Sequence, residues 1–395
     1  MTLRKRTQLQ VESLETRWVP ATFNMLMPGN NSLTLTQTTP LTGADNLLEI
    51  DDTGTLLTVT DSGVGGTTRS FNITGIANIT INLFSSDTGA VEYDLTAARS
   101  GSLTINLNNV GSRSFGLNDD AGEIGTISGG LTINDGGGDT SVSIGGGGSV
   151  IVGGNVDINL GLGADSVAIT NSASITGGNL TIKGAESTTL TAPIVGGNTT
   201  IDNFGDINPA AFTATGTFIG GSFNYRDSSG ADSITFTGAS VGGFTNINLM
   251  TQVGASSVSV VNVVSGSALN GGLSLMGGSL GAVNFTLDDT SAIHGPSINM
   301  FMMGGTNTIN LDGLITGFSV TYNSFGGGTD FFNFSPAAGS APVFLNVNLG
   351  AGNDTMVLDA TDAAPRFAMI NLGAGADSFP PILGIPFFPV RTIDF

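Results

Sequence analysis

The stretch Asn155–Thr176 reads NVDINLGLGADSVAITNSASIT and contains three short runs in which apolar and polar residues alternate. The runs are residues 155–160, 166–169 and 174–176, and a Gly-rich turn and a polar segment separate them. Strict alternation predicts β-strands with one buried face, because successive side chains of a strand point to opposite sides of the sheet. Three strands this short cannot form useful hairpins, and they therefore predict one coil of a parallel β-helix.

The same unit recurs along most of the chain. A Gly-Gly pair precedes an alternating run, 19 to 29 residues apart, at Gly129, Gly153, Gly177, Gly196, Gly220, Gly242 and Gly271, and an eroded pair continues the pattern at Gly295, Gly317, Ala341 and Ala364. We therefore expect an all-β fold, a single-stranded, right-handed parallel β-helix (solenoid) with about 23 residues and three short strands per coil, in roughly 13 to 15 coils. A β-sandwich or barrel is the alternative, which explains the strands but not the repeat.

The composition agrees with this fold and excludes several classes of function. Gly accounts for 60 of 395 residues, and Gly costs about 1 kcal/mol per helical position relative to Ala. Hydrophobic residues make up 39%, enough for a continuous core. Zero Cys and a single His, His294, exclude disulfides, thiol nucleophiles and imidazole clusters. The net charge of −20 excludes a nucleic-acid partner, because phosphate binding needs clustered Lys and Arg.

These patterns divide the chain into three segments. Residues 1–21 form an N-terminal sorting or capping segment, residues 22–378 the β-helix, and residues 379–395 a Pro-rich C-terminal cap. Residues 45–128 have strand-like runs with irregular turns, and we expect a looser version of the same coil there. The apolar C-terminal end is too short to cross a bilayer as a helix and contains four prolines, so we expect no transmembrane span.

The first 21 residues differ from everything that follows. A basic start leads into VESLETRWVPA at Val11–Ala21. This string resembles the N-terminal "LE-x-L-E-x-R-x-x-P-A" segment of planctomycete proteins, which are Gly-rich, β-repeat proteins regarded as exported or surface-attached. The matching residues are Glu12, Leu14, Glu15, Arg17, Pro20 and Ala21, whereas Val11 stands where Leu is usual. The resemblance implies an extracellular or cell-surface location; an ordinary amphipathic capping helix is the alternative.

An acidic residue recurs in the turn after the first strand of each unit. Aligned by unit, the position reads Asp139, Asp165, Glu186, Asp206, Asp232, Ser256, Val283, Asn307, Asp330, Asp354 and Asp377. Stacked carboxylates about 5 Å apart repel by roughly 1 kcal/mol in water and about 3 kcal/mol at an effective dielectric near 20. A bound cation would relieve this repulsion. In the alternative, each Asp bonds the backbone of its own turn and points into water, as Asp does in most turns.

Three of these turns, those of Asp165, Asp354 and Asp377, are close to Gly-x-Gly-x-Asp-x-apolar. They resemble the turns of RTX calcium-binding β-rolls, although RTX turns recur every nine residues and these recur once per coil. The resemblance implies Ca²⁺ held by turn carbonyls and carboxylates, hard oxygen ligands that suit this ion. The candidate ligands are Asp165, Asp330, Asp354, Asp377, Gly350, Gly352, Gly373 and Gly375. Ca²⁺ is the one cofactor that we expect.

Parallel β-helices include polysaccharide lyases and hydrolases, so an enzyme of this kind is the alternative function. Lyases need clustered cations, yet the basic residues after Arg17 are scattered singly at Arg69, Arg99, Arg113, Lys183, Arg226, Arg366 and Arg391. Hydrolases need converging carboxylates. The acidic pairs Asp51–Asp52, Asp119–Asp120 and Asp288–Asp289 lie in turn-like contexts where solvation is the ordinary explanation, and His294 is expected in a turn. We therefore expect no enzyme.

The sequence favours a structural or adhesive protein outside the cell or on its surface. Low charge and abundant Ser, Thr and Asn suit an inert rod whose side faces carry the function. A glycan or another cell-surface partner, or self-association, would then use those faces. Exposed aromatic residues would favour glycan stacking, with Phe325, Phe331 and Phe332 as candidates, while most of the 23 Phe are expected in the core.

Overall fold

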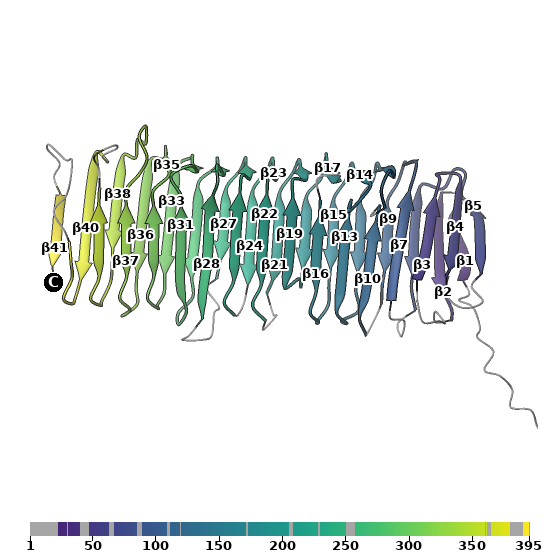
Figure 1. Ribbon diagram of the computed structural model, residues 1–395, viewed down its shortest axis with the longest axis horizontal. Helices are drawn as coiled ribbons and strands as arrows, with labels where there is room; N and C mark the ends of the chain where they lie inside the picture. Colours follow the sequence, from purple (N-terminus) through teal and green to yellow (C-terminus); the bar gives the residue numbers. More distant parts are fainter. Residues whose placement is uncertain are drawn as a thin grey trace, which may run out of the picture.

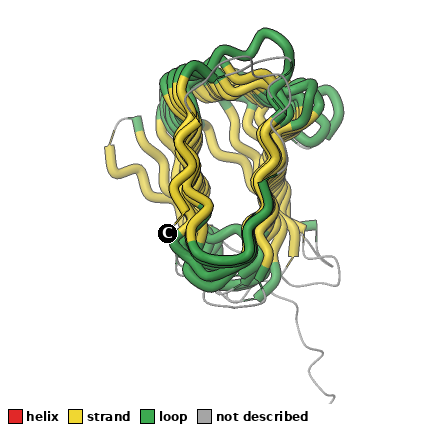
Figure 2. Tube along the Cα trace, turned by 90° about the vertical axis from the view of Figure 1, so that its left-hand side faces the viewer, coloured by secondary structure: helices red, strands yellow, loops and turns green. Residues whose placement is uncertain are grey.

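The alternating runs form short strands that wind around one axis in the computed structural model (Figure 1). The structure describes residues 23–29, 31–39, 47–62, 67–84, 89–108, 111–118, 120–170, 173–204, 208–227, 230–249, 257–359, 361, 365–379 and 390–394. Within these ranges every element is a strand, and no helix offers a route across a membrane. Seen along the axis, successive coils repeat one flattened cross-section (Figure 2). The parallel β-helix predicted from the sequence is confirmed.

Sheet A is the largest of three sheets, and from β2 to β40 each of its strands comes from a different turn of the chain, whereas β1 pairs antiparallel with β2. Its strands are, in spatial order, β1 (Phe23–Gly29), β2 (Ser32–Gln37), β6 (Asn78–Asn82), β9 (Leu103–Asn106), β12 (Leu131–Asn134), β15 (Val156–Asn159), β18 (Leu180–Lys183), β21 (Thr199–Asn203), β24 (Phe223–Asp227), β27 (Thr245–Asn248), β30 (Leu273–Gly277), β33 (Ser297–Met302), β36 (Ser319–Ser324), β38 (Phe344–Asn348), β40 (Phe367–Gly373) and β41 (Val390–Asp394).

Sheet B forms the second long side of the rod. Its strands are, in spatial order, β5 (Thr68–Asn72), β4 (Leu56–Asp61), β3 (Leu47–Asp52), β7 (Gly89–Leu95), β10 (Arg113–Leu117), β13 (Thr140–Ile144), β16 (Ser166–Ile169), β19 (Ser187–Thr191), β22 (Ala211–Thr215), β25 (Ser233–Thr237), β28 (Val258–Val264), β31 (Ala282–Leu287), β34 (Thr308–Leu311), β37 (Phe331–Phe334) and β39 (Thr355–Leu358).

Sheet C is the short third side. Its strands are β8 (Ala98–Arg99), β11 (Ile124–Ile127), β14 (Ser149–Val152), β17 (Ala173–Ile175), β20 (Ile194–Val195), β23 (Phe218–Ile219), β26 (Ser240–Val241), β29 (Ala268–Leu269), β32 (Ala292–Ile293) and β35 (Leu314–Ile315). Coils of about 24 residues give about 11 turns, fewer than the sequence predicts, because much of the segment 23–72 pairs antiparallel instead of coiling.

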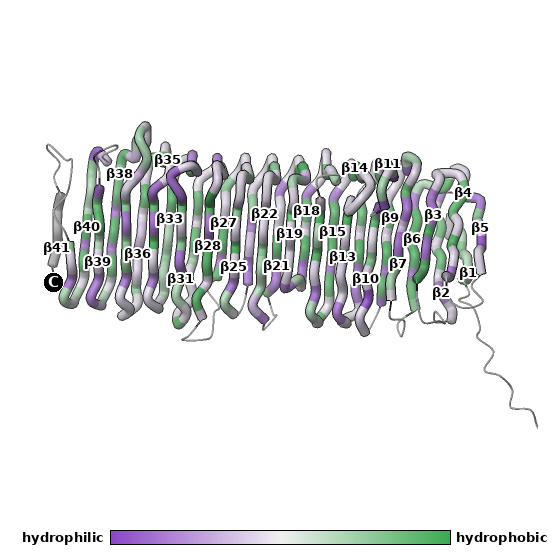
Figure 3. Tube along the Cα trace, viewed as in Figure 1, coloured by the Kyte–Doolittle hydropathy of each residue, from purple (hydrophilic) through white to green (hydrophobic). Residues whose placement is uncertain are grey.

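The core is a set of inward ladders that run along the axis. One ladder on sheet A joins Ile133, Ile158, Ile182, Ile201, Tyr225 and Ile247, which are in register and at most 1% exposed. Outward positions alternate with these inward ones, and the alternation of hydrophobic and hydrophilic residues is visible along the strands in Figure 3. Each coil is therefore stabilised by burial against its two neighbours, and the outward positions are free to vary.

The N-terminal end of the rod departs from the coil pattern. Strands β3, β4 and β5 form an antiparallel meander, so the loose coil expected over residues 45–128 is wrong for 47–72. A buried ion pair ties the meander to the first coils. Arg99 donates to Asp52 Oδ2 from Nε at 2.9 Å and also from Nη2, and the Tyr93 hydroxyl donates to the same oxygen at 2.6 Å. Asp52, predicted as a solvated turn residue, is instead fully buried in a strand.

At the other end, β41 pairs parallel with β40 and so adds a strand to sheet A. Of the predicted C-terminal cap, the structure describes residue 379 and residues 390–394. The predicted N-terminal segment 1–21 lies outside the described residues, and its sorting role stays a prediction.

Candidate functional site

The register of sheet B fixes which turn residues stand above one another. One residue per coil, at the start of the sheet B strand, forms a single file that we call the turn column: Thr140, Asp165, Glu186, Ala210, Asp232, Ser259, Val283, Asn307, Asp330, Asp354 and Asp377. The sequence alignment was wrong at Asp139, because Thr140 holds that place. Asp206 and Ser256 lie outside the described residues, and Ala210 and Ser259 hold their places. The turns before these strands differ in length. A sequence alignment that counts from the turn therefore misses the residue that strand register places in the column.

From Asp165 onward, each polar side chain of the turn column accepts a hydrogen bond from the backbone N–H of the column residue in the preceding coil. The distances are 2.6 Å from Thr140 N to Asp165 Oδ1, 3.1 Å from Ala210 N to Asp232 Oδ1, 3.0 Å from Asp232 N to Ser259 Oγ, 3.0 Å from Val283 N to Asn307 Oδ1, 2.9 Å from Asn307 N to Asp330 Oδ1, 2.7 Å from Asp330 N to Asp354 Oδ1 and 2.9 Å from Asp354 N to Asp377 Oδ1. The Asp165 N–H donates to Glu186 Oε2 in the same way.

This geometry explains why the column favours Asp, Asn and Ser. The N–H at the start of each strand points at the next coil, and a short side chain with an acceptor oxygen satisfies it. The residue after each column position is bonded by the backbone instead. For example, the N–H of Thr355, which follows Asp354, donates to Asp330 O at 2.8 Å. Ala210 and Val283 carry no acceptor, and their coils lack the link.

The carboxyl groups of Asp165, Asp330 and Asp354 are buried, so the expectation that they bond their own turn and point into water is wrong for these three. Each of the three is 1% exposed. Asp330 is satisfied on both oxygens, because the Tyr322 hydroxyl donates to its Oδ2 at 2.9 Å. In contrast, Asp165 Oδ2 and Asp354 Oδ2 are buried and accept no hydrogen bond from the described residues. An ionised carboxylate in such a place is costly unless a proton or a cation joins it.

Burial therefore raises the pKa of two column carboxyls. Desolvation raises the pKa of Asp165 to about 7, opposed by the hydrogen bond from Thr140 and reinforced by the charges of Glu186, Asp135 and Asp139. Desolvation likewise raises the pKa of Asp354 to about 6, with Asp330 and Asp377 adding repulsion. The column thus holds protons more tightly than free aspartate does.

The glycines predicted as calcium ligands are required by the close stacking of the coils. A Cβ on Gly373 would lie 1.4 Å from Gly350 O, and one on Gly375 would lie 1.5 Å from Gly352 O. Gly350 and Gly373 also have φ of +86° and +88°, a conformation that L side chains rarely adopt. The Gly-x-Gly pattern is therefore explained by backbone contact between neighbouring turns.

The donor set of the column fits a calcium ion poorly. The Oδ1 atoms of Asp165, Asp330, Asp354 and Asp377 already accept backbone N–H groups. Across the described part of the chain, no three acidic or His side chains converge as a metal site. The Oδ2 atoms of Asp165 and Asp354 are among the atoms that a cation would contact. Calcium binding by the column stays a prediction.

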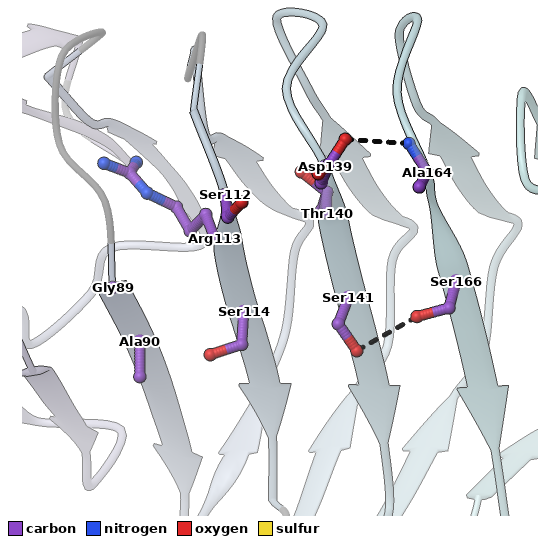
Figure 4. Close-up of a pocket in the computed structure, with 10 residues that line it drawn as sticks. All are labelled: Gly89, Ala90, Ser112, Arg113, Ser114, Asp139, Thr140, Ser141, Ala164 and Ser166. Carbon is purple, nitrogen blue, oxygen red and sulfur yellow. Dashed lines mark hydrogen bonds between the residues drawn. The ribbon is translucent and has the colours of Figure 1, made fainter.

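A shallow depression of about 450 Å³ lies beside the column on the outer face of sheet B (Figure 4). Its floor is a row of small residues from four successive strands, Ala90, Ser114, Ser141 and Ser166. Ser166 Oγ donates to Ser141 Oγ at 3.1 Å. Arg113 Nη1 donates a hydrogen bond to Leu107 O at 2.7 Å. The lining therefore offers hydroxyls, one exposed carboxylate at Asp139 and one cation that is already bonded to the backbone.

A group of carboxyls that sequence reasoning did not assemble lies at the corner between sheets B and C. Asp51 and Asp94 are in register on neighbouring strands, and Glu123 hydrogen-bonds Asp94. Burial, followed by the charge of Glu123, raises the pKa of Asp94 to about 7, and Asp51 and Asp120 add to the effect. The signal was available only through strand register, because these residues are far apart in sequence.

The other residues that the sequence analysis considered for catalysis include Asp288, His294 and Asp119. Asp288 lies in a turn as predicted, where it accepts the N–H groups of Ser265 at 2.7 Å and Thr290 at 3.2 Å. His294 Nδ1 lies 2.6 Å from Thr316 Oγ1. Asp119 lies outside the described residues.

The three Phe candidates for stacking on a ligand differ in exposure. Phe325 is 62% exposed and Phe331 36%, so both reach the surface. Phe332 is fully buried, and its assignment to the surface was wrong. The alternation of β37 explains the difference, since neighbouring residues of a strand face opposite sides.

Comparison with known proteins gives no further guide to the site: no family model, no curated protein and no solved structure matches this chain.

Proposed function

We propose that this chain is a non-enzymatic structural rod or adhesin that is displayed outside the cell or on its surface. The main support is the use that the fold makes of its charged side chains. Arg99 and Asp52 join the N-terminal meander to the coils, Arg113 holds backbone carbonyls, and the turn column bonds coil to coil. These groups stabilise the rod, and Ser, Thr and Asn occupy many of the outward positions.

The location is tested by immunogold labelling of intact and permeabilised cells that produce the chain. A surface rod predicts labelling without permeabilisation. Labelling that requires permeabilisation would contradict the proposal.

A polysaccharide hydrolase is the second candidate, and the Asp94–Glu123 pair is the observation that favours it. A carboxyl whose pKa is raised by burial and by neighbouring acidic groups is the arrangement that a general acid needs. The test is release of reducing sugar from neutral and acidic polysaccharides by the wild-type chain and by Asp94→Asn. Release by wild type that Asp94→Asn abolishes would favour the enzyme, and no release by either would favour the rod.

Calcium along the turn column is a separate proposal that rests on the unbonded oxygens of Asp165 and Asp354. Thermal melts with and without EGTA test it. A lower Tm after chelation would establish calcium as part of the fold, and an unchanged Tm would remove it.

A further inference from the structure

The C-terminal third of sheet A presents exposed aromatic rings on both sides of a polar strip. We call this surface the aromatic–amide face and define it by Phe301, Phe318, Phe325, Phe344, Phe367, Asn299, Thr321, Asn323, Asn346 and Asn348. Of the seven Phe that are at least 36% exposed among the described residues, four belong to this face: Phe318, Phe325, Phe344 and Phe367. Such a concentration of exposed apolar surface marks an interaction site more often than scattered residues do.

One border of the face is a row of three rings, one per coil, at the start of the strands. The ring centroids of Phe318 and Phe344 are 5.1 Å apart, and those of Phe344 and Phe367 are 5.2 Å apart. The three residues are 58%, 40% and 50% exposed. The row therefore supports itself by ring contacts and still leaves much of its surface open.

The other border lies at the far end of the same strands. Met276, Phe301, Met303 and Phe325 line a pocket of about 320 Å³. Phe325 follows β36, so this one strand has an exposed ring before it, at Phe318, and another after it.

The strip between the borders is polar and uncharged. Along β36 the outward residues are Ser319, Thr321 and Asn323, all half-buried. Register places Asn299 and Asn346 beside Thr321, and Asn348 beside Asn323. Amides and hydroxyls both donate and accept hydrogen bonds, as the hydroxyl groups of a sugar do.

We propose that the aromatic–amide face binds a neutral polysaccharide that lies along the rod axis, which deepens the adhesive part of the proposed function and rests on it. Apolar C–H faces of the sugars would contact the rings, and sugar hydroxyls would bond the amides. The repeat of the aromatic row, 5.1 to 5.2 Å, is close to the length of one sugar unit, so successive units meet equivalent groups. The net charge of −20 disfavours acidic polymers.

Affinity electrophoresis of the full chain in gels containing soluble xylan, glucomannan or mixed-linkage β-glucan tests this proposal, with polygalacturonate as the acidic comparison. We expect retardation by at least one neutral polymer and none by polygalacturonate. Phe344→Ser and Phe325→Ser should each weaken the apparent affinity at least tenfold. Phe218→Ser is the matched control, because Phe218 is 48% exposed on sheet C, away from the face, and it should leave the affinity unchanged.

Three results would overturn the proposal: no retardation by any neutral polymer, equal loss in Phe218→Ser, or face variants that change only self-association in sedimentation runs. The last result would assign the face to a second copy of the chain. Melting curves of each variant separate loss of binding from loss of fold. Surface labelling of intact cells is independent of this face, so failure here leaves the rod proposal standing.

Discussion

Two regions of sheet A share one register but present opposite kinds of outer surface. In the N-terminal coils an amide ladder satisfies itself: Asn82 donates to Thr36 at 3.2 Å, Asn106 to Asn82 at 2.7 Å, Asn134 to Asn106 at 2.8 Å and Asn159 to Asn134 at 2.9 Å. In the C-terminal coils the same row holds Asn323, Asn348 and Asn371, with one such bond, 3.2 Å from Asn371 to Asn348, and open rings flank it.

The two regions show that the inward positions of each coil are constrained, whereas the outward positions can differ from coil to coil. Inward ladders are constrained by packing along the whole rod, because each coil buries its apolar residues against the next. Outward positions can close on one another, which stabilises the rod, or stay open, which leaves them available to a partner.

The largest effect is expected at the same N-terminal end of the rod, where Asp52 of sheet B meets Arg99 of sheet C. Arg99→Met removes the cation and leaves Asp52 buried, which should lower the free energy of unfolding by about 3–5 kcal/mol, the usual consequence of breaking a buried ion pair. Urea unfolding measures the change. Asp52→Asn combined with Arg99→Met should recover part of it. A loss below about 1 kcal/mol would show that the pair is solvated.

The turn column should make calcium-free protein more stable in acid. The pKa values of Asp165 and Asp354 are raised to about 7 and 6, so the folded state binds protons more tightly than the unfolded state. Their stabilising contribution is complete at low pH and is lost as the pH rises through these values.

We therefore expect a higher Tm at pH 5 than at pH 8 in the presence of EGTA. Asp165→Asn and Asp354→Asn should each reduce the difference. Hydrogen bonds lower the pKa of Asp288 and of Asp359, so the stability that these two residues contribute is lost only at more acidic pH. They therefore do not affect the comparison between pH 5 and pH 8. A higher Tm at pH 8 would contradict the account of the column.

A smaller difference should separate an amide that is bonded in the first region from an amide that is not bonded in the second. Asn106 takes part in two amide bonds, and Asn106→Ala should cost about 1–2 kcal/mol of unfolding free energy. Asn346 makes no side-chain hydrogen bond to the described residues, and Asn346→Ala should cost under about 0.5 kcal/mol. Equal costs in urea unfolding would mean that the ladder bonds add nothing.

The smallest effect on stability is expected at the open border. Phe325 is 62% exposed, so Phe325→Ser should change the free energy of unfolding by less than about 0.5 kcal/mol, as at most surface positions. Differential scanning calorimetry checks this. A loss of several kcal/mol would show that the ring is structural.

Periodicity was enough to predict the coil, because alternation and Gly-rich turns follow directly from strand and turn geometry. It did not predict the antiparallel meander of β3 to β5, because a strand has the same alternating pattern whether its neighbour is parallel or antiparallel. The buried pair of Asp52 and Arg99, which are 47 residues apart in the chain, left no local signal for the same reason.

The turn column could be predicted in part. Its acidic character was legible at Asp165, Asp330, Asp354 and Asp377, but Thr140 could be placed only by strand register. The pattern also could not show that each carboxyl turns towards the preceding coil, because the direction of a side chain depends on backbone geometry between coils. The aromatic row was missed because Phe318, Phe344 and Phe367 come together only when the coils stack.

The open end of sheet A, and not its closed end, should contact the ligand. Hydroxyl-radical footprinting with and without the neutral polysaccharide should show protection at Phe318, Phe344, Phe367 and Met303, and none at exposed Ile124 and Ile151 of sheet C. Protection confined to the N-terminal coils, or the absence of any protection, would contradict it.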